Sequence, residues 1–170
     1  MITSRDHAGK PIISITDGKD LGEIKGLYLD PDMRRVAGVF VGSEGLLNRK
    51  PLALSQNDVR VCGVDVWLVS GPEVVKPMEE IPESISFIPV TDVRGREVQT
   101  EGGTKLCVIE DIILDNDAHV LGFMLGRVFS EGPLAERKTV SRDAFLTLGN
   151  KEAPMTVDLA QAESLTIQSI

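Results

Sequence analysis

Paired carboxylates are the first candidates for chemistry in this sequence, because the same pair occurs twice. Asp30 and Asp32 form one pair, and Asp115 and Asp117 form the other. Two close carboxylates could hold a cation. A calcium loop, however, needs six or more oxygen ligands, and no acidic residue follows either pair at the loop spacing. Asp is also a preferred turn residue. We therefore interpret both pairs as turn residues and predict no metal site.

The histidines and serines do not form a catalytic set either. The two histidines are His7 and His119, and His119 aligns internally with Arg35 rather than with a histidine. Ser55 and Ser141 do recur, but neither lies in the G-x-S-x-G turn of a nucleophilic serine. A side chain that caps the following turn is the better interpretation. We predict no catalytic residue, and we expect that the protein is not an enzyme.

Cofactor binding finds no better support in the residue pattern. Gly102 and Gly103 are followed neither by a phosphate-binding motif nor by a helix. The two cysteines, Cys62 and Cys107, form neither a disulfide framework nor a metal-ligand pattern. Their expected state is a pair of free thiols in a reducing cytoplasm. The sequence predicts no cofactor and no cofactor-binding residue.

The elements that would position any site come from an internal repeat. Residues 5–63 can be aligned with residues 91–149 with two small shifts. The matched positions are mostly glycines, apolar residues and turn residues, so the repeat describes a fold rather than an active site. They include Asp6 with Asp92, Gly9 with Gly95, Lys10 with Arg96, Leu21 with Leu106, Leu29 with Leu114, Gly38 with Gly122, Ser55 with Ser141 and Gly63 with Gly149.

Each copy is rich in short apolar segments separated by glycine-bearing turns, which predicts an all-β protein. In the second strand of the first copy, Gly26 interrupts the apolar spacing and predicts a bulge or a sharp bend. The tail, 159–170, fits either a short helix or an edge strand. The predicted strands of the first copy are Pro11–Ile15, Leu21–Leu29, Val36–Val41, Pro51–Leu54, Val59–Val61 and Val64–Val69. Those of the second are Glu97–Thr100, Leu106–Leu114, Val120–Leu125, Thr139–Val140, Phe145–Leu148 and Met155–Val157.

The repeat predicts two domains and a connector. The first domain covers residues 1–72, a proline-rich linker covers 73–85, and the second domain covers 86–170. Four prolines near the linker favour an extended, semi-stiff connector, with Phe87 and Ile88 beginning the second domain. Domains this small bury only about 60% of their unfolded surface. We therefore expect the two to pack on each other.

Three motifs in order carry a family resemblance. G-K-P-I at 9–12, D-G-K-D-L-G-E-I-K-G-L-Y-L-D-P at 17–31 and R-V-A-G-V-F-V at 35–41 resemble a PRC-barrel domain. The second copy, with G-R-E-V at 95–98, G-G-T-K-L-C-V-I-E-D-I-I-L-D at 102–115 and H-V-L-G-F-M-L at 119–125, is similar. The resemblance implies two small PRC-like β-barrels in tandem, each of about six short antiparallel strands.

The resemblance also implies a kind of function. The fold occurs in small stand-alone bacterial and archaeal proteins, in the cytoplasmic domain of the photosynthetic reaction-centre H subunit, and in the C-terminal domain of a ribosome-maturation factor. In the characterised cases it contacts other proteins and does no chemistry of its own. This sequence has neither the membrane helix of the H subunit nor the N-terminal domain of the maturation factor. Neither specific function is therefore carried over.

Charge is unevenly distributed along the chain and suggests where a partner binds. Residues 1–76 hold ten basic and ten acidic residues, whereas residues 77–170 hold eight and sixteen, so the second part carries the whole net charge of −8. An acidic surface repels phosphate backbones, which makes nucleic acid an unlikely partner. The sequence instead favours another protein. The predicted partner face is made of Glu110, Asp111, Asp115, Asp117 and Glu136.

These observations predict a non-enzymatic protein-interaction or scaffold module whose partner is unknown. The alternative is a small-molecule or cofactor-binding protein with a pocket between the two barrels. No apolar segment is long enough to span a bilayer, and the first residues lack a signal-peptide pattern. We therefore expect a cytoplasmic protein that does not span a membrane. Peripheral association with a membrane complex and homo-oligomer formation both stay open.

Overall fold

The computed structural model describes residues 1–167 of the chain, and most of its regular structure is β-strand. This confirms the all-β prediction. The strands of the first part are β1 (Ile2–Thr3), β2 (Pro11–Ser14), β3 (Asp20–Glu23), β4 (Gly26–Leu29), β5 (Val36–Glu44), β6 (Lys50–Ser55), β7 (Val59–Cys62), β8 (Trp67–Val69) and β9 (Lys76–Pro77). Those of the second part are β10 (Ile88–Pro89), β11 (Glu97–Thr100), β12 (Lys105–Leu114), β13 (Val120–Val128), β14 (Thr139–Ser141), β15 (Phe145–Thr147) and β16 (Met155–Val157).

The helices are short and lie in the connections. The α-helices are α1 (Val90–Val93), α2 (Pro133–Arg137) and α3 (Leu159–Ser164). The 3₁₀ helices are η1 (Ser4–His7), η2 (Gln56–Asp58), η3 (Pro72–Val74), η4 (Met78–Glu80), η5 (Pro82–Ser86) and η6 (Arg142–Ala144). The tail begins as helix α3, whose first turn is capped by the Asp158 carboxylate at 2.9 Å from the Gln161 amide. Within residues 1–167, no helix has the length and apolar character needed to cross a membrane.

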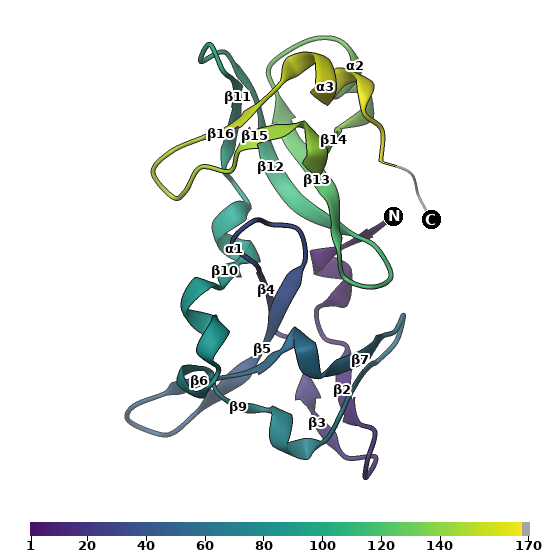
Figure 1. Cartoon of the computed structure of the whole chain (residues 1–170), viewed down its shortest axis with the longest axis vertical. Coiled ribbons are helices and arrows are strands. Elements are labelled where there is room, and N and C mark those ends of the chain that lie inside the picture. The colour runs from purple at the N-terminus through teal and green to yellow at the C-terminus, as the bar shows by residue number, and fades with distance from the viewer. Residues whose placement is uncertain (168–170) are drawn as a thin grey trace.

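The strands form three sheets, two of them in the lower part of Figure 1 and one in the upper part. The first part forms a four-stranded sheet, ordered β3-β2-β8-β7, and most of a five-stranded sheet, ordered β10-β4-β5-β6-β9. The edge strand β10 of that sheet comes from the second part. The second part holds one sheet ordered β14-β13-β12-β11-β16-β15, with β1 added beside β12. No strand pairing within residues 1–167 closes any of these sheets into a ring. Closed barrels therefore remain a prediction. The prediction of purely antiparallel strands is wrong, because β2 pairs with β8 and β11 pairs with β16 in parallel.

At the bend predicted near Gly26, the expected strand is interrupted completely. The expected single strand Leu21–Leu29 is two strands, β3 and β4, which belong to different sheets. Gly22 has a φ of +120°, a conformation that favours glycine. The corresponding strand of the second part, β12, stays continuous and absorbs its curvature in register shifts.

The connector between the two parts packs against the first sheets instead of spanning free space. β9 pairs with β6, and β10 pairs with β4. Phe87 stacks on Tyr28 with ring centroids 5.2 Å apart. Ile88 pairs with Leu29 of β4, whereas the sequence predicted that Phe87 and Ile88 begin the second domain. The domain boundaries 1–72, 73–85 and 86–170 themselves stay a prediction.

The two parts of the chain are joined by reciprocal crossings. β1 leaves the first part to pair with β12, with Ile2 opposite Leu114. β10 pairs with β4, with Ile88 opposite Leu29, and these residues occupy the aligned positions. Between the crossings, the Val120 amide donates to the Arg34 carbonyl at 2.8 Å, and the Val36 amide donates to the Ala118 carbonyl at 2.9 Å. One buried hydrophobic cluster contains residues of both parts, so they share a core.

Candidate binding clefts

The duplicated carboxylates serve the backbone of their own turns. Asp30 accepts hydrogen bonds from the amides of Arg34 and Arg35, at 2.7 and 3.1 Å. Asp115 accepts from the amides of Asp117 and His119, at 2.9 and 2.8 Å. Across residues 1–167, no three His, Cys, Asp or Glu side chains are grouped as a metal site would require. One carboxylate of each pair, Asp30 and Asp115, thus acts as a turn residue. Ser55 and Ser141 likewise cap the turns that follow them, as predicted.

The structure does not gather the five residues of the predicted partner face into one patch. Asp115 and Asp117 lie in the turn before β13, and Glu136 lies on α2, which follows β13. The chain turns back after β13, and the Leu125 amide donates to the Lys138 carbonyl at 2.8 Å, two residues after Glu136. The five steps from Val120 to Leu125, at about 3.3 Å each, therefore place the two sites roughly 17 Å apart. Glu110 lies on β12, where its carboxylate is 4.0 Å from the Arg5 guanidinium. A basic partner would therefore meet these residues as separate sites rather than as one patch.

Asp111 is buried, with 2% of its surface exposed, so it cannot belong to an exposed face. Its carboxylate accepts hydrogen bonds from the Ser4 hydroxyl and the Ile112 amide, and Arg94 lies 3.4 Å away. Burial alone would raise the pKa of this carboxyl group, but those hydrogen bonds outweigh burial and lower the pKa. Asp111 thus ties η1 of the first part to β12 and α1 of the second.

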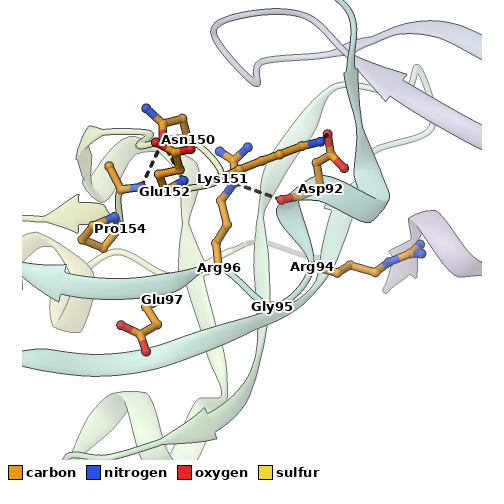
Figure 2. Close-up of a pocket in the computed structure, with 10 residues that line it drawn as sticks. Asp92, Arg94, Gly95, Arg96, Glu97, Asn150, Lys151, Glu152 and Pro154 are labelled. Carbon is orange, nitrogen blue, oxygen red and sulfur yellow. Dashed lines mark hydrogen bonds and ion pairs between the residues drawn. The ribbon is translucent and has the colours of Figure 1, made fainter.

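A cleft of about 490 Å³ lies between the α1–β11 segment and the turn that precedes β16. We call it the second-half cleft, and Figure 2 shows the side chains around it. It is lined by Asp92, Arg94, Gly95, Arg96, Glu97, Asn150, Lys151, Glu152, Ala153 and Pro154.

The charged groups of the second-half cleft are engaged within the protein. Lys151 reaches across the cleft to Asp92, with 3.3 Å between nitrogen and oxygen. Arg96 donates to the carbonyls of Asp92 and Leu148, each at 3.0 Å. Arg94 points away from the cleft and donates to the Ser4 hydroxyl at 2.7 Å (Figure 2). The lining contains no serine, cysteine or histidine. These contacts position the turn before β16 and assemble no nucleophile.

A second, smaller pocket of about 270 Å³ lies where the two parts meet. We call it the inter-half pocket. It is lined by Ile2, Asp6, His7, Lys10, Cys62, Gly63, Val64, Asp115 and Asn116. Its cysteine is not activated, because burial raises the pKa of the Cys62 thiol.

His7 is the most perturbed group in the inter-half pocket. Its side chain is 3% exposed, and burial, together with the nearby charge of Lys10, lowers its pKa from 6.5 to about 4. The Trp67 indole donates to Nδ1 at 3.2 Å, and the Lys10 ammonium lies 3.0 Å from the same nitrogen. Nε2 is buried without a hydrogen-bond partner in the described part of the chain. The neutral ring therefore carries its proton on Nε2 and accepts at Nδ1.

The two cavities occupy aligned positions in the two copies. Lys10 donates to the carbonyl of Gly63 at 3.2 Å, and Arg96, its aligned residue, donates to the carbonyl of Leu148 at 3.0 Å. In both copies a basic side chain thus fixes the turn between the last two strands. The sequence contained this signal in the aligned basic residues, but spacing alone did not connect them to the turn.

Comparison with known proteins supports the resemblance for part of the chain. A PRC-barrel domain is found at residues 1–69, a segment that ends with β8. No curated protein gives a significant match to the chain. The first copy therefore carries a PRC-barrel domain, and the match does not extend to the second copy.

Proposed function

We propose that the protein is a non-enzymatic interaction or scaffold module, built of two PRC-barrel-like units, whose partner is another protein. The domain at residues 1–69 supports the first unit. The reciprocal pairing of β1 with β12 and of β10 with β4 at aligned positions supports the second. A cytoplasmic location is part of the same proposal.

The observation that carries the proposal is exposed negative charge on the second part of the chain. Asp111 is buried and drops out of the predicted face, whereas Asp117 and Glu136 are exposed. In the described part of the chain, neither has a cationic partner within 4.0 Å. The first part has balanced charge and the second carries the whole excess. A partner with a basic surface would therefore be steered to the second part.

Capture of partner proteins by the purified chain from a native lysate, at low and at high salt, tests the proposal. Asp117→Lys and Glu136→Lys are examined separately, because the two residues lie at separate sites. Asp65→Lys, at an exposed position of the first part, is the matched control for the change in charge. We expect one of the two second-part variants, and high salt, to reduce capture of a specific protein. An unchanged set of captured proteins in both variants would show that the acidic residues are not the binding surface.

The inter-half pocket favours the alternative, a small-molecule or cofactor-binding protein. Its volume is about 270 Å³ and its lining comes from both parts of the chain. Native mass spectrometry of the purified protein would detect a retained ligand. Val64→Trp places a large side chain at the pocket and should remove the added mass if a ligand is held there. Wild-type protein at its bare chain mass would leave the interaction module as the better proposal.

A further inference from the structure

The two copies differ at one seam between strands. In the second part, β12 and β13 stay paired as far as Cys107 with Val128, and the Phe129 amide donates to the Leu106 carbonyl at 2.8 Å. In the first part, the pairing of β4 with β5 stops at Gly26 with Phe40. β3 pairs only with β2, so the edge of β3 that faces β5 has no strand partner in the described residues.

The open seam forms a cleft of about 480 Å³, which we call the β3–β5 cleft. Its apolar lining consists of Pro11, Leu21, Val41, Leu52 and Val75. Its charged lining consists of Asp20, Glu23 and Lys25. An unpaired strand edge beside a partly apolar cleft is a surface that other chains readily occupy.

The second copy shows what fills the aligned position. There the connection after β13 folds into α2 and buries Leu134, which is 2% exposed. Leu134 belongs to the same buried cluster as Leu106 and Leu125, the residues aligned with Leu21 and Val41. The connection between the third and fourth strands of the second copy therefore buries a leucine in the shared core.

In the first copy, the same connection leaves its leucines in water. Leu46 and Leu47, at the tip of the β5–β6 hairpin, are 100% and 97% exposed. The hairpin projects from the body of the molecule at the lower left of Figure 1. Its strands stay paired out to Glu44 with Lys50, and Lys50 is also 3.0 Å from the Glu79 carboxylate. Only the residues 45–49 remain for the turn, so the tip cannot fold back into its own cleft without breaking the ladder.

We propose that Leu46 and Leu47 of one copy dock into the β3–β5 cleft of a second copy of this chain. Ser43 lines the cleft and lies three residues before Leu46, so tip and cleft share one face of the molecule. A two-fold axis through that face would insert both tips at once, as an isologous interface requires. Both signs of charge occur on each side, with Glu44 and Arg49 at the tip and Asp20, Glu23 and Lys25 on the cleft, so opposite charges can meet across the interface.

Sedimentation velocity of the full chain, from low micromolar to several hundred micromolar, tests the dimer. We expect a monomer–dimer equilibrium in the wild type. Leu46→Ser with Leu47→Ser should raise the dissociation constant at least about tenfold, because apolar anchors dominate such interfaces. Ile85→Ser, which truncates a 94% exposed side chain of the connector, is the control and should leave the equilibrium unchanged. A wild type that stays monomeric throughout would overturn the proposal, even if it captures another protein.

A charge exchange tests the docking geometry without altering the core. Arg49→Glu alone and Glu23→Lys alone should each weaken the dimer, because each brings like charges together across the interface. The chain that carries both substitutions should regain most of the lost affinity. Because both residues are exposed, the variants should fold normally. If the double variant loses as much dimerisation free energy as the two single variants lose together, the tip does not enter this cleft.

Discussion

Acid should destabilise the protein through His7 well before its carboxylates are protonated. The imidazole is buried against Trp67, with ring centroids 5.1 Å apart in an edge-to-face arrangement. Its Nδ1 accepts from the Trp67 indole, so protonation at that nitrogen would break this hydrogen bond and place a charge beside Lys10. The perturbation is therefore a fall in pH from 7 to the low fours, compared between the wild type and His7→Phe.

The magnitude follows from the pKa of His7, which is lowered from 6.5 to about 4 in the folded protein. Between these values the unfolded chain binds one more proton than the folded chain, so the free energy of unfolding falls as the pH falls. The stabilisation is fully present above pH 6.5 and is lost as the pH approaches 4. Lowering the pKa of His7 from 6.5 to about 4 corresponds to about 3.4 kcal/mol of unfolding free energy. Screening by solvent in the adjoining pocket reduces this to about 2 kcal/mol.

Urea denaturation at a series of pH values measures the effect. The wild type should lose about 2 kcal/mol between pH 6.5 and pH 4 from this group. His7→Phe keeps an aromatic ring against Trp67 but cannot titrate, so its stability should depend less steeply on pH over that interval. His119→Asn removes the exposed histidine of the β12–β13 turn and serves as the control. Equal pH slopes in the wild type and in His7→Phe would refute this reasoning, whatever their stabilities at pH 7.

Three further predictions concern stability. Gly38→Val should lower the urea midpoint and cost about 1–3 kcal/mol of unfolding free energy. The reason is that a Cβ at Gly38 would lie 2.6 Å from Cζ of the Phe87 ring. An unchanged midpoint would show that the ring moves aside freely. Asp32→Asn should leave the melting temperature nearly the same in calcium and in chelator, and a calcium-dependent rise abolished by the substitution would restore the metal interpretation. Asp111→Asn should cost about 3 kcal/mol in chemical denaturation, because Arg94 loses its buried carboxylate; a loss no larger than that of an exposed carboxylate would contradict the burial.

The strands were predictable from the sequence because local signals determine them. Glycine and Asp-Gly turns delimit β2 and β3, and Gly26 interrupts the apolar spacing where the chain changes sheets. The partners of those strands were not predictable in the same way. The crossing of β1 to β12 and of β10 to β4 depends on contacts more than 50 residues apart, which no local pattern encodes. For the same reason, the prolines indicated a connector, but not that its residues would add edge strands to the first sheet.

The candidate site was harder to predict from the sequence than the fold. Asp111 follows Glu110, and two adjacent carboxylates are typical of a solvated surface. In β12 one of the two points outward and the other inward, yet the residues that follow, Ile112 and Ile113, are both buried. Alternation therefore could not show which carboxylate lies inside. His7 is buried against Trp67, which lies 60 residues away in the sequence, so no local pattern could show the burial that lowers its pKa.

The two crossings that join the copies are aligned in sequence but differ in chemistry. Beside β1, Asp111 bonds to Ser4 and Arg94. At the other crossing the aligned positions hold Gly26, Val90 and Ala8, which carry no polar side chain.

This difference makes the leading segments of the two copies non-equivalent. If the segment with Val90 paired with β12, Asp111 would be buried without the Ser4 hydroxyl, at the cost of an unsatisfied charge. If the segment with Ser4 paired with β4, its hydroxyl would meet Gly26 and find no carboxylate. The buried polar group thus favours one pairing over its near-symmetric alternative, which is the role best attested for such groups. Two copies that share a core and similar strands can in this way still assemble in a single arrangement.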